Sequence, residues 1–128
     1  MATKRMFSLQ VIDSDKFLDL PASAQALYFH LGMRADDDGF VNNPKKIARM
    51  ICVGDDDLKL LFLKGFIIDA NNGIIVITHW HINNYIQKDR YHPTIYLNEK
   101  QHFCLDKNKL YTKQIQPVSI MDTQIRLV

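Results

Sequence analysis

An Asn-Gly pair between two β-branched runs constrains the fold of this chain more than any other feature. The two runs cover residues 66–69 and 74–80, and the residues between them end in Asn72 and Gly73. Asn-Gly in this position is the strongest short-range signal of a β-hairpin, because both residues tolerate the positive φ angles of a tight turn. The sequence therefore predicts an antiparallel hairpin, preceded by segments with a different period.

A long helix is predicted upstream of the hairpin. Its apolar residues recur along one face at helical spacing over residues 20–35, and Pro21 suits its first turn. A single capped turn over residues 14–18 is expected before it. After it, three aspartates and Gly39 indicate a turn, and residues 40–41 are typical of a very short strand.

Two shorter helices are predicted between this strand and the hairpin. Asn43 can cap the first of them, and Pro44 fits its first position. The second covers residues 55–64, and Gly65 is a natural stop at its end. The buried stripe of the first short helix is predicted to consist of Ile47, Ala48, Met50 and Ile51.

The predicted order is helix, strand, helix, helix, strand, hairpin tip, strand, which is the order of a winged helix-turn-helix. We therefore expect an α+β fold, mainly α, in which a three-helix bundle and a small antiparallel hairpin occupy residues 1–83. Residues 84–128 would form a C-terminal extension that is helical or irregular. One or two helical turns are expected over residues 82–88 and a polar helix over 98–110. Residues 111–128 show no clean period and can order against a partner or a second copy of the chain.

Composition narrows the class of protein. With 128 residues, 47% apolar residues and a formal charge of +2, the chain can build one small core. No apolar run approaches the length of a membrane span and the first ten residues do not resemble a signal peptide, so a cytoplasmic protein is expected. Residues 1–83 carry nine basic and ten acidic side chains and residues 84–128 carry seven and four, so any attraction to polyanions favours the second part.

No catalytic or cofactor site can be assembled from the sequence. It lacks both a recognisable nucleophile with its base and a glycine-rich phosphate loop, so we expect no enzymatic activity, no cofactor and no small-molecule substrate. A metal site is not expected either. A zinc site would have to draw on His79, His81, His102 and Cys104, without a close-spaced pair to complete it. The aspartates at 36–38 lack the alternating ligands of a calcium loop, and a plain turn is the simpler interpretation.

Charge argues against the usual docking of a helix-turn-helix on DNA. The second helix of that motif normally places its first residues against base edges in the major groove. Here those residues are Asp55, Asp56 and Asp57, which the helix dipole stabilises but the phosphates repel. The hairpin tip offers Asn71 and Asn72 but no Arg or Lys for a minor groove.

Basic residues elsewhere make up the candidate DNA site. Lysines in the first turn of a helix oppose its dipole, so Lys45 and Lys46 suggest a use beyond stability, although a merely solvated face is the alternative. Contacts would be to phosphates, with strong salt dependence and weak sequence dependence. The candidate nucleic-acid-binding residues are Lys45, Lys46, Arg49, Lys88, Arg90 and Tyr91. If single strands are bound, Tyr85, Tyr91 or Tyr96 can stack on exposed bases.

Four segments together resemble one protein family. They are residues 6–12 (MFSLQVI), 20–32 (LPASAQALYFHLG), 37–51 (DDGFVNNPKKIARMI) and 80–96 (WHINNYIQKDRYHPTIY). In combination they look like the N-terminal domain of phage replisome organiser proteins, which are similar to DnaD-type primosome proteins. The resemblance covers residues 6 to about 100, whereas the family usually continues into a longer linker and a C-terminal region.

The resemblance implies a winged-helix domain in a phage or prophage replication initiation protein. Such a protein binds or assembles at an origin and helps to recruit helicase-loading proteins, and in DnaD-type relatives this domain also serves oligomerisation. Two alternatives stay open. One is an interaction module without direct DNA binding, in which an exposed edge at strand residues 74–77 or the tail residues Ile115, Val118, Ile120 and Met121 join copies or partners. The other is a transcriptional regulator of the same fold.

Overall fold

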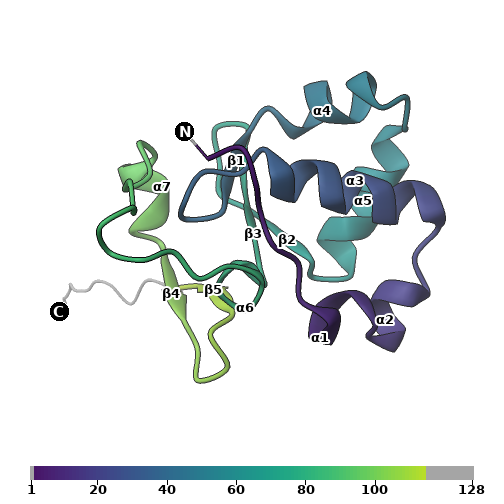
Figure 1. Cartoon of the computed structure of the whole chain (residues 1–128). Helices are drawn as coiled ribbons and strands as arrows, with labels where there is room; N and C mark the ends of the chain where they lie inside the picture. The colour runs from purple at the N-terminus through teal and green to yellow at the C-terminus, as the bar shows by residue number, and fades with distance from the viewer. Residues whose placement is uncertain (1, 115–128) are drawn as a thin grey trace, which may run out of the picture.

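The computed structural model describes residues 2–114, and the tail residues considered above as an interaction surface lie outside this range. Within it the chain has an α+β fold with two small antiparallel sheets (Figure 1). The first part contains α1 (Leu9–Ile12), α2 (Asp15–Leu18), α3 (Ala22–Met33), β1 (Phe40–Asn42), α4 (Pro44–Met50), α5 (Asp55–Leu63), β2 (Ile67–Asp69) and β3 (Ile74–Ile77). The second part contains α6 (Trp80–Asn83), α7 (Leu97–Lys100), β4 (Phe103–Leu105) and β5 (Tyr111–Lys113).

Local signals in the sequence account for the helix ends. The Ser14 hydroxyl accepts the Phe17 amide and starts α2. Asn43 adopts a left-handed conformation, with φ of 56°, and its side chain accepts the Lys46 amide at the start of α4. Gly65, with φ of 80°, follows the end of α5. The predicted positions of these three helices are confirmed.

The predicted hairpin is also confirmed. β2 and β3 pair antiparallel, with Ile67 opposite Ile77, and the turn between them has positive φ angles at Asn71, Asn72 and Gly73. β1 pairs with the other edge of β3, so the strand order is β1-β3-β2. β3 is therefore the central strand, and the prediction of a free apolar edge along residues 74–77 is wrong.

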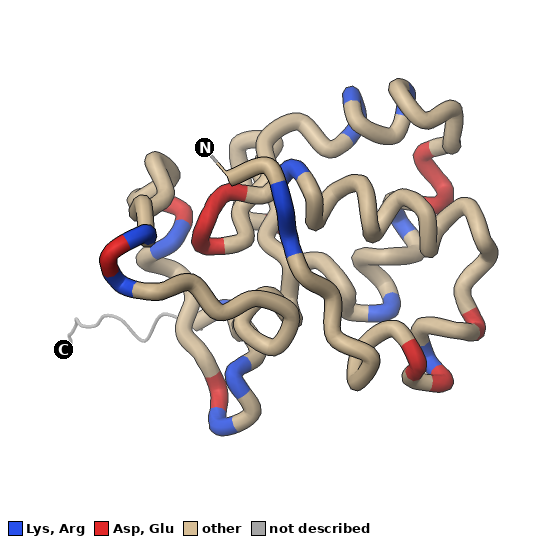
Figure 2. The backbone as a smooth tube through the Cα atoms, viewed as in Figure 1, with Lys and Arg blue, Asp and Glu red and all other residues tan. Residues whose placement is uncertain are grey.

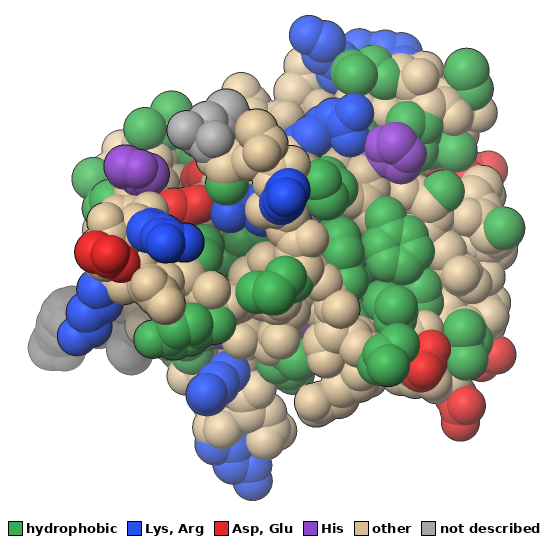
Figure 3. All heavy atoms as spheres, in the orientation of Figure 1, with side chains coloured by type: hydrophobic (Ala, Val, Ile, Leu, Met, Phe, Trp, Pro, Cys, Tyr) green, Lys and Arg blue, Asp and Glu red, His purple; other side chains and the backbone are tan. Residues whose placement is uncertain are grey.

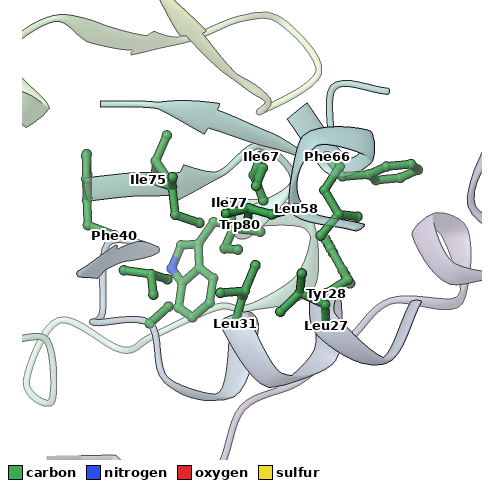
Figure 4. Packing of buried hydrophobic residues seen from close by; sticks show 14 of the residues in the cluster. Leu27, Tyr28, Leu31, Phe40, Leu58, Phe66, Ile67, Ile75, Ile77 and Trp80 are labelled. Carbon is green, nitrogen blue, oxygen red and sulfur yellow. The ribbon is translucent and has the colours of Figure 1, made fainter. Parts of the chain in front are cut away.

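The three longest helices pack on one face of this sheet. Figure 4 shows Leu27 and Leu31 of α3 pointing toward the strands, with the Trp80 ring beside Leu31. All of these side chains are buried, together with Leu58 of α5. Burial of a side chain of this size stabilises the fold by about 1.5 to 3 kcal/mol relative to exposure, so this layer makes a large contribution to the stability.

The extension covers the opposite face of the sheet, as Figure 1 shows. The Phe40 ring of β1 lies 6.0 Å from the rings of both Phe103 and Tyr111, measured between centroids. The Tyr111 amide also donates to the carbonyl of Thr78 at 3.0 Å. As a result every residue of β3 is buried, which explains its unbroken run of apolar residues.

Three predictions for the second half of the chain are wrong. The strand predicted to reach Trp80 ends at Ile77, and Trp80 begins α6. The helical turns expected over 82–88 stop at Asn83, because the backbone of Asn84 is extended, with φ of −132°. The side chains of Asn83 and Asn84 accept the backbone amides of Ser8 and Met6. The polar helix expected over 98–110 is the short α7 followed by the β4–β5 hairpin, in which Asp106 accepts two amides of the turn.

Candidate nucleic-acid interface

α4 carries three of the predicted DNA-binding residues on its outer face. Ile47 and Ala48 are buried against the core, so the helix directs Lys45, Lys46 and Arg49 into solvent. Met50, which was predicted to be buried, is 57% exposed instead. Figure 2 shows the basic positions of α4 along the upper edge of the molecule.

These α4 cations have no carboxylate partner among residues 2–114. The two ion pairs in that range are Arg5–Asp37, at 3.0 Å, and Lys100–Asp38, at 3.2 Å. Unpaired surface cations attract polyanions from solution, whereas paired ones contribute little to the external field. The electrostatic condition for phosphate contact is therefore met on α4.

The loop between α6 and α7 carries the second predicted group. Lys88 and Arg90 are both exposed, with Asp89 between them, and the Arg90 amide closes a turn on the Gln87 carbonyl at 2.9 Å. In Figure 2 this loop lies at the opposite edge of the molecule from α4, and the basic part of the N-terminal segment runs between them. The structure therefore spreads the predicted residues over one face rather than collecting them in one cluster.

Tyr91 has a different environment from the other predicted residues. Its hydroxyl lies 2.7 Å from both carboxylate oxygens of Asp38, and Lys100 Nζ lies 3.2 Å from the same hydroxyl. Burial and the hydrogen bond to Asp38 raise the pKa of Tyr91, although Lys100 opposes this. The contacts of Tyr91 therefore anchor the extension to residues 36–38.

Residues 36–38, which we call the acidic loop, accept several hydrogen bonds from the C-terminal extension. Sequence reasoning missed these contacts. Asp38 is 3% exposed and accepts the Thr94 amide as well as the Tyr91 hydroxyl. Its backbone carbonyl accepts the Tyr111 hydroxyl at 2.7 Å. Asp36 accepts the Thr94 hydroxyl and two amides of its own turn. These bonds tie the extension to the first part of the chain, which a plain turn would not do.

The carboxyls of Asp36 and Asp37 respond oppositely to their surroundings. Burial raises the pKa of Asp36, even though its hydrogen bonds favour the charged form. Burial would also raise the pKa of Asp37, but the His92 amide and the Arg5 guanidinium outweigh it, and the pKa lies below its usual value. Arg5 also donates to the Ala35 carbonyl and lies over the Trp80 ring. The positive charge of Arg5 is paired with the carboxylate of Asp37.

Two adjoining grooves lie on the face that carries these residues. The first, of about 640 Å³, runs between α4 and residues 92–96, and its lining includes Arg34, Lys46, Met50, Pro93, Ile95 and Tyr96. The second, of about 530 Å³, includes Lys4, Tyr85, Ile86 and Arg90. Ala2, Arg5, Asp37 and His92 line both grooves and join them. Figure 3 shows cationic and hydrophobic side chains interspersed on this side of the molecule.

Only some of the predicted DNA-binding residues line a groove. Lys46 lines the first groove and Arg90 the second, whereas Lys45, Arg49 and Lys88 lie on the surface outside both. Sequence reasoning did not include Arg34 or Lys4, because a single cation at a helix end or in an N-terminal segment carries no pattern. The structure also brings Tyr85 and Tyr96 beside cations, one in each groove.

The surfaces that a helix-turn-helix normally uses are ill suited to DNA. Asp55 and Asp56 are exposed in the first turn of α5, and Asp57 accepts the Ser23 hydroxyl at 2.9 Å. At the tip of the β2–β3 hairpin, the Asn72 amide group donates to the Glu99 carboxylate of α7 at 2.9 Å. Phosphates would meet negative charge at both places.

The positions of the histidines bear on a metal site, and the lengths of the helices bear on a membrane span. His79 and His81 do not alternate along a strand, because His79 caps α6 and His81 lies inside it. Among residues 2–114, no group of three or more His, Cys, Asp or Glu side chains is placed to hold a metal ion. In the same range, no helix has both the length and the apolar character that a membrane span requires.

Comparison with known proteins identifies no relative. No protein-family model matches the chain, and neither a curated protein nor a solved structure shows significant similarity to it. The assignment of a function therefore depends on the residues, their arrangement and the resemblance described above.

Proposed function

We propose that this chain is a winged-helix DNA-binding protein that acts in replication initiation. It is non-enzymatic, works in the cytoplasm, and is of the phage or prophage replisome organiser type, assembling with replication or helicase-loading proteins. Support comes from the order α3, β1, α4, α5, β2, β3 with sheet order β1-β3-β2, which is the order expected of a winged helix. Further support comes from the four sequence segments that resemble that family.

One observation carries the DNA-binding part of the proposal. Lys45, Lys46 and Arg49 extend from one face of α4 with no carboxylate partner among the described residues. The acidic start of α5 and the occupied hairpin tip argue against the usual docking pose. DNA would therefore contact α4 and the grooved face through its phosphates, with little sequence preference.

Fluorescence anisotropy over increasing salt tests this proposal. A labelled duplex and a labelled single strand, each of about 20 nucleotides, are titrated with the full chain between about 50 and 200 mM salt. Binding at low salt that weakens by at least tenfold over this range is expected, because several phosphate contacts release counterions. Absence of binding to both oligonucleotides at low salt would contradict the proposal.

A second candidate function is an interaction module that joins copies or partners. Exposed apolar side chains at the N-terminal part of the chain favour it, namely those of Met6, Leu9 and Leu18. Figure 3 shows hydrophobic side chains gathered near α1, α2 and α3. Sedimentation velocity over a wide concentration range tests the joining of copies, since a monomer at all concentrations argues against self-association.

A further inference from the structure

The joined grooves combine cations with exposed apolar surface. Ile95 is 83% exposed and Met50 57% exposed, and both line the first groove beside Lys46. Tyr85 is 79% exposed and lines the second groove beside Arg90. Exposed apolar side chains that are grouped rather than scattered indicate a binding surface.

This combination discriminates between duplex and single-stranded nucleic acid. A duplex presents phosphates on its outside and keeps the faces of its bases stacked inside. Its phosphates can therefore contact the cations, but the apolar walls of the grooves would stay exposed to water. An unpaired strand offers both phosphates and base faces, and base faces stack on aromatic side chains. The volumes of both grooves fall in the usual range of small-ligand pockets, which is the scale of single nucleotides rather than of a double helix.

The carboxylates that line the grooves do not oppose this assignment. The two linings together hold five cationic side chains, Lys4, Arg5, Arg34, Lys46 and Arg90, and two carboxylates, Asp36 and Asp37. Asp37 is paired with Arg5 at 3.0 Å, and Asp36 accepts the Thr94 hydroxyl and the amides of Asp38 and Phe40. Among residues 2–114 the other four cations have no carboxylate partner, and two of them line each groove.

We propose that the joined grooves bind one single-stranded polynucleotide in preference to a duplex. Unpaired bases would lie against Tyr96 in the first groove and Tyr85 in the second, and the phosphates between them would contact Lys46 and Arg90. This inference rests on the proposed DNA-binding function and adds the strandedness of the ligand. The α4 residues outside the grooves, Lys45 and Arg49, would contact phosphates without distinguishing a single strand from a duplex.

Anisotropy with matched oligonucleotides tests the preference. Labelled dT20, rU20 and a 20-base-pair duplex are titrated with the full chain and with the variants Tyr85→Ala and Lys46→Glu. Leu63→Ala and Lys59→Glu serve as controls, because both side chains are exposed on α5 and line neither groove. Circular dichroism melting of each variant verifies that it is folded, which is expected for exposed side chains.

The expected result has two parts. The single strands bind at least tenfold more tightly than the duplex, and Tyr85→Ala weakens single-strand binding by about fivefold or more while duplex binding is unchanged. Equal affinity for dT20 and rU20 also supports the inference, since stacking does not read the sugar. The inference would be overturned if the duplex bound as tightly as the single strands and if Tyr85→Ala had the same affinities as Leu63→Ala. The proposed function would then still stand. Failure of all three oligonucleotides to bind would overturn both.

Discussion

Gly39 is a residue where the fold tolerates little change. Its φ of +88° is unfavourable for any side chain, and a Cβ atom there would lie 2.6 Å from Cγ of Trp80. Trp80 cannot move freely, because its indole nitrogen donates to the Asp37 carbonyl at 2.9 Å and Arg5 lies over its ring. The turn after α3 and the position of the indole therefore depend on each other.

Gly39→Ala is expected to lower the free energy of unfolding by about 2 to 4 kcal/mol, because backbone strain and overpacking add. Urea unfolding followed by Trp80 fluorescence measures it. Gly73→Ala is the matched control, since Gly73 has a similar φ of +76° but no atom within 4 Å of its Cβ position. The control should cost only about 1 kcal/mol. Equal losses in the two variants would show that contact with Trp80 is unimportant.

Two histidines make stability depend on pH. Burial lowers the pKa of His79, with the Lys16 charge adding to the effect, and burial also lowers the pKa of His81 although Asp38 opposes it. Below the ordinary value of 6.5, the unfolded chain therefore binds more protons than the folded chain. Stability must then fall as the pH falls through this range.

The free energy of unfolding is expected to decrease as the pH is lowered from 7.5 to 5.5, and the double variant His79→Gln/His81→Gln should show a smaller decrease. Urea titrations at several pH values measure both curves. Above pH 7.5 the two curves should run parallel, because histidine is neutral there in both states. A wild-type protein that becomes more stable on acidification over this range would contradict the assignment.

At the scale of elements, α4, α5 and the β2–β3 hairpin could be predicted because their signals are local. Asn43 and Pro44 mark the start of α4, and Asn72 with Gly73 marks the hairpin turn. The extension could not be predicted in the same way. Phe103 and Tyr111 become buried only by packing on Phe40, which is more than 60 residues away, and no periodicity encodes such a contact.

The candidate site was predicted in part for the same reason. The cations of α4 follow from the helical period, which separates them from the buried Ile47 and Ala48. The grooves could not be foreseen, because the bonds of His92 and Thr94 to the acidic loop hold residues 92–96 near α4. Tyr91 was expected to contact nucleic acid. That a tyrosine stands at this position could not reveal its hydrogen bond to Asp38, which is distant in the sequence.

The three cations of α4 are expected to act together on the salt dependence of DNA binding. The variant Lys45→Ala/Lys46→Ala/Arg49→Ala should reduce the slope of log affinity against log salt by about 2 to 3, because each lost phosphate contact removes about 0.7 to 0.9. Salt titrations by anisotropy measure the slope. Lys59→Ala/Lys64→Ala, at exposed positions on and after α5, should leave it within about 0.5 of wild type. A triple variant with an unchanged slope would exclude α4 from the interface.

At the scale of the whole molecule, the sheet is covered on both faces, by helices on one side and the extension on the other. The sequence divides the chain at residues 83 and 84, yet Phe103 and Tyr111 belong to the same core as Phe40. The acidic loop provides most of the polar bonds across that division. The two parts therefore depend on each other for burial.

A fragment of residues 1–83 is expected to lose at least half of the free energy of unfolding of the full chain, because it exposes Phe40 and the outer face of β3 to water. Urea unfolding of the fragment and the full chain measures the difference. Equal stability of the two would show that the extension is an independent appendage.

Mapping the bound DNA on the folded chain tests whether α4 and the grooved face form the DNA interface. Backbone amide shifts in a ¹H–¹⁵N spectrum are followed while dT20 is added to the full chain. The proposed interface predicts that the largest changes occur in residues 44–50 and 84–96, with little change at residues 55–58 and 70–73. Changes concentrated at the start of α5 and the tip of the β2–β3 hairpin would contradict it.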